Sequence, residues 1–164
     1  MLRRWLGVLF GILMASGAAL AAEDPVILTV SGQIGKWTNN KSRTYEFRES
    51  DLQALSQHAI TTRTSWTPEA VFSGPLMRDI LRRVEARGGQ VKFVALNDYA
   101  YTVSRDELEK YNVILARSFN HKPMAIKERG PLWLMYPLPD MPAEERGPLL
   151  DAKLIWQVYR ITVY

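Results

Sequence analysis

Hydrophobic and polar residues alternate in several short runs, each bounded by glycine, proline or other turn-forming residues. Thr44–Phe47 alternates polar and apolar side chains, which is typical of a strand with one buried face. Val26–Ile34 is rich in β-branched residues and runs into a turn at Gly32 and Gly35. We therefore expect strands at Val26–Ile34, Thr44–Phe47, Val91–Leu96, Tyr99–Val103, Asn112–Ala116 and Leu132–Tyr136, and one long or two short β segments in Lys153–Tyr164.

Helical spacing is clearest after Ser73-Gly74-Pro75. Proline is tolerated in a first helical turn, and Gly88-Gly89 offers a left-handed end, so the pattern predicts a helix between them. Its buried face would hold Leu76, Met77, Ile80, Leu81 and Val84.

Two shorter helices are predicted by capping-box spacing. One begins at Ser50 and carries Leu52 and Leu55, with His58 interpreted as its end. The other begins at Ser104 and carries Leu108. Asn120–Pro123 has turn chemistry, with His121 expected to be exposed, and the proline-rich Leu138–Gly147 is expected to be an ordered surface loop.

The predicted strands and short helices intermix without a regular βαβ rhythm. This order predicts an α+β fold, a mixed β-structure with short helices. The chain has 164 residues, enough for one domain with a hydrophobic core and too few for two ordinary ones.

The amino end has the three parts of a secretory signal. Arg3 and Arg4 are followed by the apolar stretch Trp5–Leu13 and then by small residues that include Ala19-Leu20-Ala21. We expect residues 1–22 to be a cleaved signal peptide and residues 23–164 to be one domain in the periplasm. The alternative is a retained membrane anchor, because the apolar stretch approaches the ~20 residues that span a bilayer. The acidic pair Glu23-Asp24 favours cleavage.

Charge and cysteine content exclude several classes of function. The formal charge is +4, but without Arg3 and Arg4 only 19 basic residues stand against 17 acidic ones, and no basic block remains for nucleic acid. The chain has no cysteine, which excludes thiolate nucleophiles, iron–sulfur clusters and cysteine-bound metals. With only His58 and His121, a multi-histidine metal site is not expected either.

Several segments, taken in order, resemble the oxidoreductase molybdopterin-binding domain of sulfite oxidases. The similarity is spread over residues 23–164 and implies the sulfite-oxidase-type molybdopterin-binding fold. The segments that carry it are Leu28–Gly32, Phe72–Leu76 with Ile80-Leu81, Asn97–Tyr99 with Val103-Ser104, Ile114–Ala116, Asn120–Met124 and Arg129–Leu132.

The sequence departs from this family where the chemistry would occur. In catalytic relatives a cysteine that binds molybdenum lies four residues before a tryptophan, and counting back from Trp66 gives Thr62. A threonine hydroxyl is a hard, neutral donor and does not replace a soft thiolate. Trp133 stands where relatives often have an arginine, and His121 replaces a turn glycine. The resemblance thus implies molybdopterin as an alternative cofactor, whereas the residues favour none.

The expected export route agrees with this interpretation. Arg3-Arg4 is a twin arginine, but only two residues precede it and Trp5-Leu6-Gly7 follows, so the motif is incomplete. We favour the general secretory route, which delivers an unfolded chain without cofactor.

If the family pocket is retained, small polar groups, cations and an aromatic ring are expected to line it and to bind a small anionic or polar ligand. Each candidate also has a structural interpretation, as strand surface, turn or solvated loop. We find no nucleophile–base–orienter set and no metal-ligand set. The candidate ligand-binding residues are Thr62, Arg63, Thr64, Trp66, Asn97, Asp98, Tyr99 and Arg129.

Three functions remain open from the sequence. The first is a non-catalytic periplasmic module that binds or senses a small ligand and signals to a membrane sensor protein. The second is a molybdopterin oxidoreductase that binds its cofactor without the cysteine. The third is a structural interaction protein of the envelope, with the loop Leu138–Pro148 as its contact.

Overall fold

The computed structural model describes residues 23–164, and the predicted signal peptide lies outside them. The described chain forms β-strands and short helices around one hydrophobic core, in which the largest fully buried side chains include Trp133, Tyr136 and Phe93. Among the helices of residues 23–164, none is long and apolar enough to cross a membrane.

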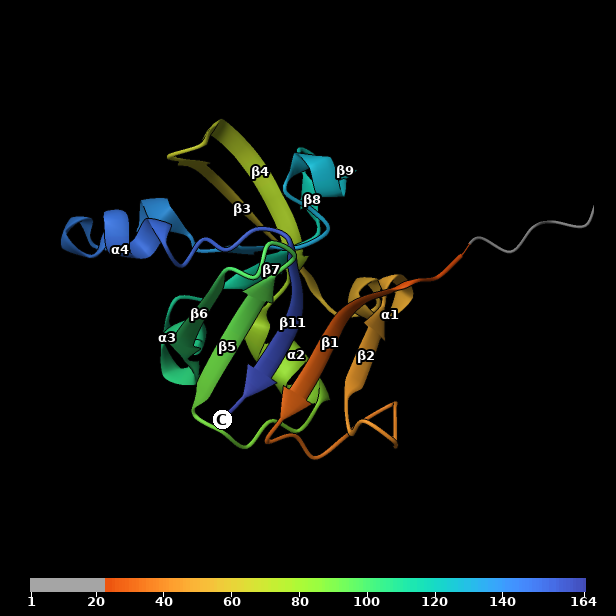
Figure 1. Ribbon diagram of the computed structural model, residues 1–164. Coiled ribbons are helices and arrows are strands. Elements are labelled where there is room, and N and C mark those ends of the chain that lie inside the picture. The colour runs from red at the N-terminus through yellow and green to blue at the C-terminus, as the bar shows by residue number, and fades with distance from the viewer. Residues whose placement is uncertain (1–22) are drawn as a thin grey trace, which may run out of the picture.

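A five-stranded sheet forms one side of the molecule, in the order β2-β1-β11-β5-β6 (Figure 1). The C-terminal strand β11 lies at its centre, parallel to β1 and antiparallel to β5. The other neighbours in this sheet are antiparallel. The strands are β1 (Val26–Gly32), β2 (Tyr45–Arg48), β5 (Gln90–Ala95), β6 (Ala100–Ser104) and β11 (Val158–Val163). These bounds confirm the strands predicted there, with a single strand at the C-terminus.

The remaining strands form two smaller sheets, ordered β3-β4-β8-β9 and β10-β7. The long β3–β4 hairpin extends well beyond the five-stranded sheet (Figure 1). At its base Gly74 is required by close packing, because a Cβ there would lie 2.1 Å from the Leu115 carbonyl oxygen on β7. The strands are β3 (Gln57–Thr64), β4 (Thr67–Pro75), β7 (Ile114–Ala116), β8 (Ser118–Phe119), β9 (Lys122–Pro123) and β10 (Trp133–Met135).

Residues 138–153, here called the arm, project from the body on the side opposite α1 (Figure 1). The arm contains two 3-10 turns, Leu138–Asp140 and Ala143–Glu145, and the short helix α4 (Pro148–Asp151). The sequence predicted an ordered surface loop for most of this segment, and the structure confirms it. A further 3-10 turn, η1 (Ile126–Glu128), follows β9.

The principal helix is shorter than the sequence predicted. Pro75 ends β4, paired with Gln57, and is not in the first helical turn; α2 (Met77–Arg83) begins after Leu76. The helix ends at Val84, since Glu85 has a left-handed φ of 52°. Gly88 therefore does not end the helix; a Cβ there would lie 1.9 Å from the Tyr164 carbonyl oxygen.

The two shorter helices confirm the capping pattern in part. In α3 (Arg105–Lys110) the Ser104 hydroxyl accepts a hydrogen bond from the Glu107 N–H at 3.2 Å, as predicted. The helix α1 (Glu49–Gln53) begins one residue before Ser50, with Arg48 as its cap. His58 does not end this helix: it lies in β3, paired with Gly74, so that interpretation was wrong.

Candidate ligand-binding site

An aromatic cavity of about 410 Å³ opens where three separate segments meet. The segments are the β3–β4 turn, the β5–β6 turn and the chain from α4 to the start of β11. We call this space the aromatic cavity. Its lining residues are Trp66, Ala95, Asn97, Tyr99, Pro148, Asp151, Ala152, Leu154, Ile155 and Trp156.

The β3–β4 turn brings Trp66 to the cavity. The Thr64 hydroxyl oxygen accepts hydrogen bonds from the backbone N–H groups of Trp66 and Thr67, both at 3.1 Å, and so fixes this turn. The neighbouring Ser65 hydroxyl donates to the Asp151 carboxylate at 2.6 Å. The tip of the hairpin is thereby tied to α4 across the cavity.

The β5–β6 turn provides the second wall. Asp98 has a left-handed φ of 65°, and the Asn97 side-chain oxygen accepts a hydrogen bond from the Tyr99 N–H at 3.2 Å. The Tyr99 hydroxyl reaches across the cavity and donates to the Ala152 carbonyl oxygen at 2.8 Å. This turn is therefore also tied to the segment that follows α4.

Tryptophan rings form the floor. Trp66 meets Trp156 edge to face, with ring centroids 4.8 Å apart, and Trp156 meets the buried Trp133 in the same manner at 5.9 Å. The Trp133 indole N–H donates to the Leu154 carbonyl oxygen at 3.0 Å, which satisfies its only polar group. Trp66 and Tyr99 remain 38% and 43% exposed, so their rings are available to a ligand.

The cavity carries little charge. Asp151 is the one carboxylic acid among its lining residues, and one oxygen of that carboxylate already accepts the Ser65 hydrogen bond. Asn97 adds an amide. Aromatic walls with few polar groups suit a small organic molecule with an apolar body. The carboxylate disfavours an anion here, because like charges repel.

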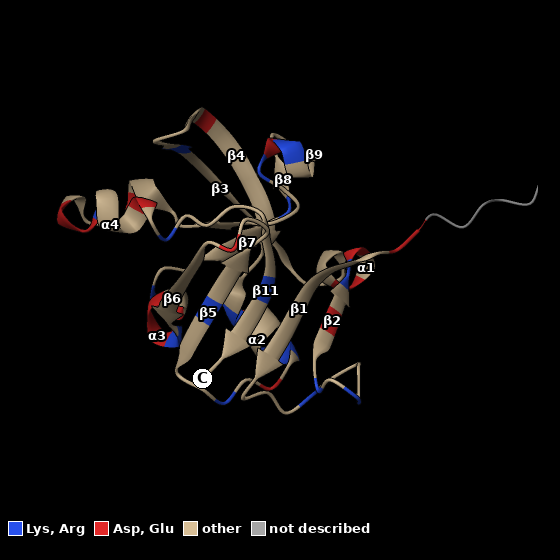
Figure 2. Cartoon of the chain, in the orientation of Figure 1, with Lys and Arg blue, Asp and Glu red and all other residues tan. Residues whose placement is uncertain are grey.

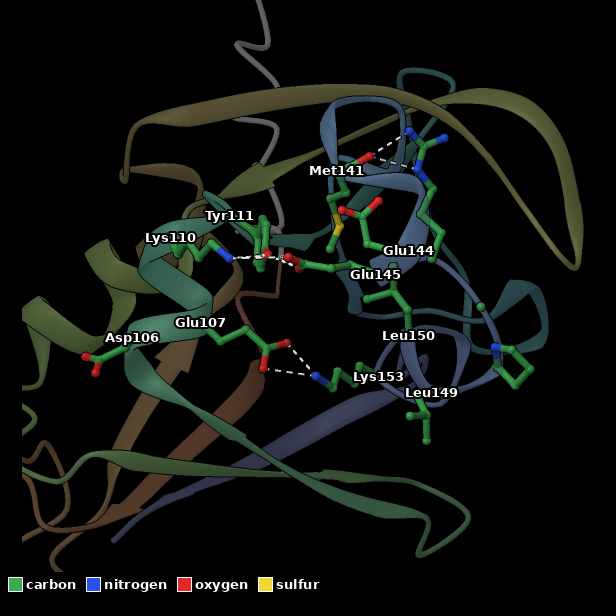
Figure 3. A pocket seen from close by; sticks show the side chains of 13 residues that line it. Asp106, Glu107, Lys110, Tyr111, Met141, Glu144, Glu145, Leu149, Leu150 and Lys153 are labelled. Carbon is green, nitrogen blue, oxygen red and sulfur yellow. Dashed lines mark hydrogen bonds and ion pairs between the residues drawn. The ribbon is translucent and has the colours of Figure 1, made fainter.

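A larger cavity of about 720 Å³ lies between α3 and the arm (Figure 3). Four of its charged side chains form two ion pairs across it. Lys153 donates to both Glu107 oxygens at 2.7 and 2.9 Å, Lys110 lies 3.5 Å from the Glu145 carboxylate, and Tyr111 hydrogen-bonds Glu145. These groups satisfy one another and anchor the arm, which forms one wall of the aromatic cavity.

The anchor extends into the core through Tyr136. Its hydroxyl donates to Glu107 at 2.9 Å. Burial raises the pKa of Tyr136 well above its ordinary value, and the adjacent Glu107 carboxylate raises this pKa further. Tyr136 therefore stays protonated and remains a hydrogen-bond donor to Glu107.

Three of the eight sequence-predicted residues meet at the aromatic cavity: Trp66, Asn97 and Tyr99. Thr64 and Asp98 shape the two turns beside it without lining it. The remaining predicted residues, Thr62, Arg63 and Arg129, do not line this cavity.

These three residues have different surroundings. Thr62 is only 2% exposed, and its hydroxyl donates to the Arg63 carbonyl oxygen at 3.1 Å. Arg63 is exposed on β3. Arg129 lines a separate cavity with Trp133.

Sequence reasoning missed the half of the site contributed by the arm and the chain after it. The sequence pattern selects neither Trp156 nor Asp151 as a candidate ligand-binding residue. No local motif marks either residue. Their role arises only because tertiary contacts bring α4 against the β3–β4 turn.

Comparison with known proteins gives one level of similarity, that of the fold. No protein-family model matches the sequence, and no curated protein matches it significantly. Among solved structures, the sulfane dehydrogenase SoxCD from Paracoccus pantotrophus superimposes with a TM-score of 0.62 at 15% sequence identity. The match covers 84% of this chain and 37% of that chain. It confirms the α+β fold of sulfite-oxidase type, and at this identity it shows the fold alone.

The sequence resemblance implies a molybdenum ligand at position 62, and the threonine found there does not fit that role. Thr62 offers a neutral hydroxyl that is already hydrogen-bonded and almost fully buried, where the family uses an anionic thiolate. Within residues 23–164 no cluster of three His, Asp or Glu side chains could hold a metal ion instead.

Proposed function

We propose that this domain is a non-catalytic, exported binding module that takes up a small organic ligand in the aromatic cavity. The observation that carries the proposal is the convergence of Trp66, Tyr99 and Trp156, from three distant segments, around a space of about 410 Å³. Aromatic side chains this exposed, beside an amide and a carboxylate, are typical of small-molecule sites.

The chemistry of the cavity walls limits the class of ligand that can bind. Flat or apolar parts of the molecule would pack against the indole and phenol rings. Hydrogen-bond donors on the ligand would face the Asp151 carboxylate and the Asn97 side chain. We therefore propose a polar, neutral or cationic organic molecule for this cavity. Of the anionic and polar ligands expected from the sequence, these walls favour the polar class.

The architecture also supports a sensing role. Two hydrogen bonds span the cavity, from Ser65 to Asp151 and from Tyr99 to Ala152. Both acceptors lie at the end of the arm, in α4 or directly after it. A ligand bound between these segments would join the hairpin and the arm more firmly. A membrane sensor protein that contacts the arm in the periplasm would then detect the ligand through the reduced motion of the arm.

A structural interaction role is the second candidate. Leu149 on α4 is 78% exposed, the most exposed of the large hydrophobic residues found on the described surface. A partner that covers the arm would bury this side chain. Such a partner is compatible with sensing, but a purely structural role requires no ligand.

Ligand screening tests the proposal. The exported protein is screened by thermal shift against neutral, cationic and anionic metabolites, because a ligand at 100 times its Kd stabilises the native state by about 2.7 kcal/mol. Trp66→Ala should weaken binding of each hit by at least about tenfold, consistent with the energy of a lost aromatic contact.

Trp37→Ala is the matched control, since Trp37 is 40% exposed and lines none of the cavities described above. Equal effects of the two substitutions, or no stabilising ligand, would contradict ligand binding at this site. Stoichiometric molybdenum in protein purified from its native periplasm would instead support the oxidoreductase.

A further inference from the structure

A third cavity, of about 620 Å³, lies beside β8 and β9 and shares no lining residue with the aromatic cavity. Figure 2 shows basic residues around β9 and the turn that follows it. We call this space the basic cavity. Its lining residues are Phe119, Asn120, Lys122, Pro123, Met124, Lys127, Glu128, Arg129 and Trp133.

The backbone holds Arg129 in one place. Its carbonyl oxygen accepts a hydrogen bond from the Gln157 N–H at 3.0 Å. The Gln157 side chain donates in turn to the Ile126 carbonyl oxygen at 2.9 Å, at the start of the turn that Arg129 ends. The arginine is thus fixed to the chain that enters β11.

Two indole rings orient the guanidinium. The Arg129 Cζ atom lies 5.6 Å from the ring centroid of Trp133 and 5.7 Å from that of Trp156. Cation–π contact of this kind positions the cation without using its N–H groups. The fork geometry of arginine then remains available for a planar or tetrahedral oxyanion.

No acceptor within residues 23–164 uses these donors. The Arg129 guanidinium has no side-chain hydrogen bond and no ion pair there, although the residue is half-buried. Arg117, by contrast, is also half-buried and donates to both Glu49 oxygens at 2.9 and 2.8 Å. A positioned arginine without an acceptor, facing a cavity, is the arrangement expected of an anion site.

The net charge of the residues that line the basic cavity also favours an anion. Lys122, Lys127 and Arg129 contribute three cations against the single carboxylate of Glu128, and none of these four residues forms an ion pair with another described residue. The unbalanced positive charge attracts an anion, and the half-buried setting of Arg129 reduces screening by salt.

We propose that the basic cavity is a second site, which binds the oxyanion group of a small molecule through the Arg129 guanidinium, with Lys122 and Lys127 adding attraction. This inference does not depend on the aromatic cavity, which has the opposite charge preference.

Phosphate titration tests the site. Inorganic phosphate is added to the exported protein at constant ionic strength, with sodium chloride as the balancing salt, and tryptophan fluorescence is recorded because Trp133 and Trp156 contact Arg129. We expect a saturable change in the wild type and binding at least about tenfold weaker in Arg129→Gln. Arg129→Lys keeps the positive charge but loses the two parallel N–H donors of the guanidinium. Its affinity for phosphate should therefore lie between those of the wild type and Arg129→Gln.

Arg160→Gln is the matched control. Arg160 also stacks on an aromatic ring, 5.4 Å from the centroid of Tyr159, yet lines none of the cavities described above. This variant should bind phosphate as the wild type does. A response that is not saturable, that sodium chloride reproduces, or that Arg129→Gln retains would overturn the proposal.

A second variant separates binding from folding. Lys122 and Lys127 are exposed, so replacing both with glutamine should leave the unfolding temperature unchanged and weaken phosphate binding several-fold. An unchanged phosphate affinity in this double variant would contradict the role given to the two lysines. Sulfate and acetate titrations then rank tetrahedral against planar oxyanions.

Discussion

The ion pair between Glu107 and Lys153 should set both the stability of the arm and the shape of the aromatic cavity. Lys153 donates to the two Glu107 oxygens at 2.7 and 2.9 Å, and the side chains of the pair are only 24% and 22% exposed. We consider replacing Lys153 with methionine, which keeps the length and the apolar stem but removes the charge.

The burial of the ion pair sets the expected loss in the free energy of unfolding. Breaking a fully buried pair destabilises a protein by about 3–5 kcal/mol, whereas a surface pair contributes about 0–1 kcal/mol. A pair that is about three-quarters buried falls between these limits, and Glu107 keeps its hydrogen bond from Tyr136. Lys153→Met should therefore lower the free energy of unfolding by about 2 kcal/mol, and it should also weaken ligand stabilisation at the aromatic cavity.

Urea denaturation of the wild type, Lys153→Met, Glu107→Gln and the double variant measures this directly. Because the residues interact, the double variant should lose about 1–2 kcal/mol less than the sum of the single losses. Hydrogen exchange should report faster opening of residues 138–153 in each single variant. If the losses add within about 0.5 kcal/mol, or exchange in the arm does not change, the anchor does not work as described.

Two further predictions concern the core. Gly74→Ala should destabilise by about 2 kcal/mol or more, because its Cβ would lie 2.1 Å from the Leu115 carbonyl oxygen; an unfolding midpoint equal to that of the wild type would contradict the packing of β4 on β7. The raised pKa of Tyr136 means that the folded state holds this proton more tightly than the unfolded chain. Its contribution is therefore full below about pH 10, the ordinary tyrosine pKa, and declines as pH rises above it. Tyr136→Phe should reduce the loss of urea resistance as pH rises above about 10, and an unchanged loss would refute this role.

The sequence was sufficient for most strands of the fold. The alternation in Thr44–Phe47 and the Asn97-Asp98 turn each correspond to a short-range signal, and the structure has β2 and the β5–β6 turn there. The start of α2 was misjudged because Pro75 is compatible with both a first helical turn and a strand end. Pro75 belongs to the strand because it pairs with Gln57, 18 positions away in the chain.

The site was only half predictable for the same reason. Trp66, Asn97 and Tyr99 could be selected because family-like motifs surround them. Asp151 and Trp156 have no such marker, and their place depends on long-range contacts such as the hydrogen bond from Ser65. Thr62 was informative about missing chemistry, but its side chain is buried elsewhere and is not among those that line the cavity.

The central claim is that a small organic ligand occupies the space between Trp66, Tyr99 and Trp156. A crystal structure of the protein with its most strongly stabilising ligand tests this most directly. The account predicts ligand density against these three rings, within hydrogen-bonding reach of Asp151 or Asn97. Density at another surface, with the aromatic cavity empty, would contradict it.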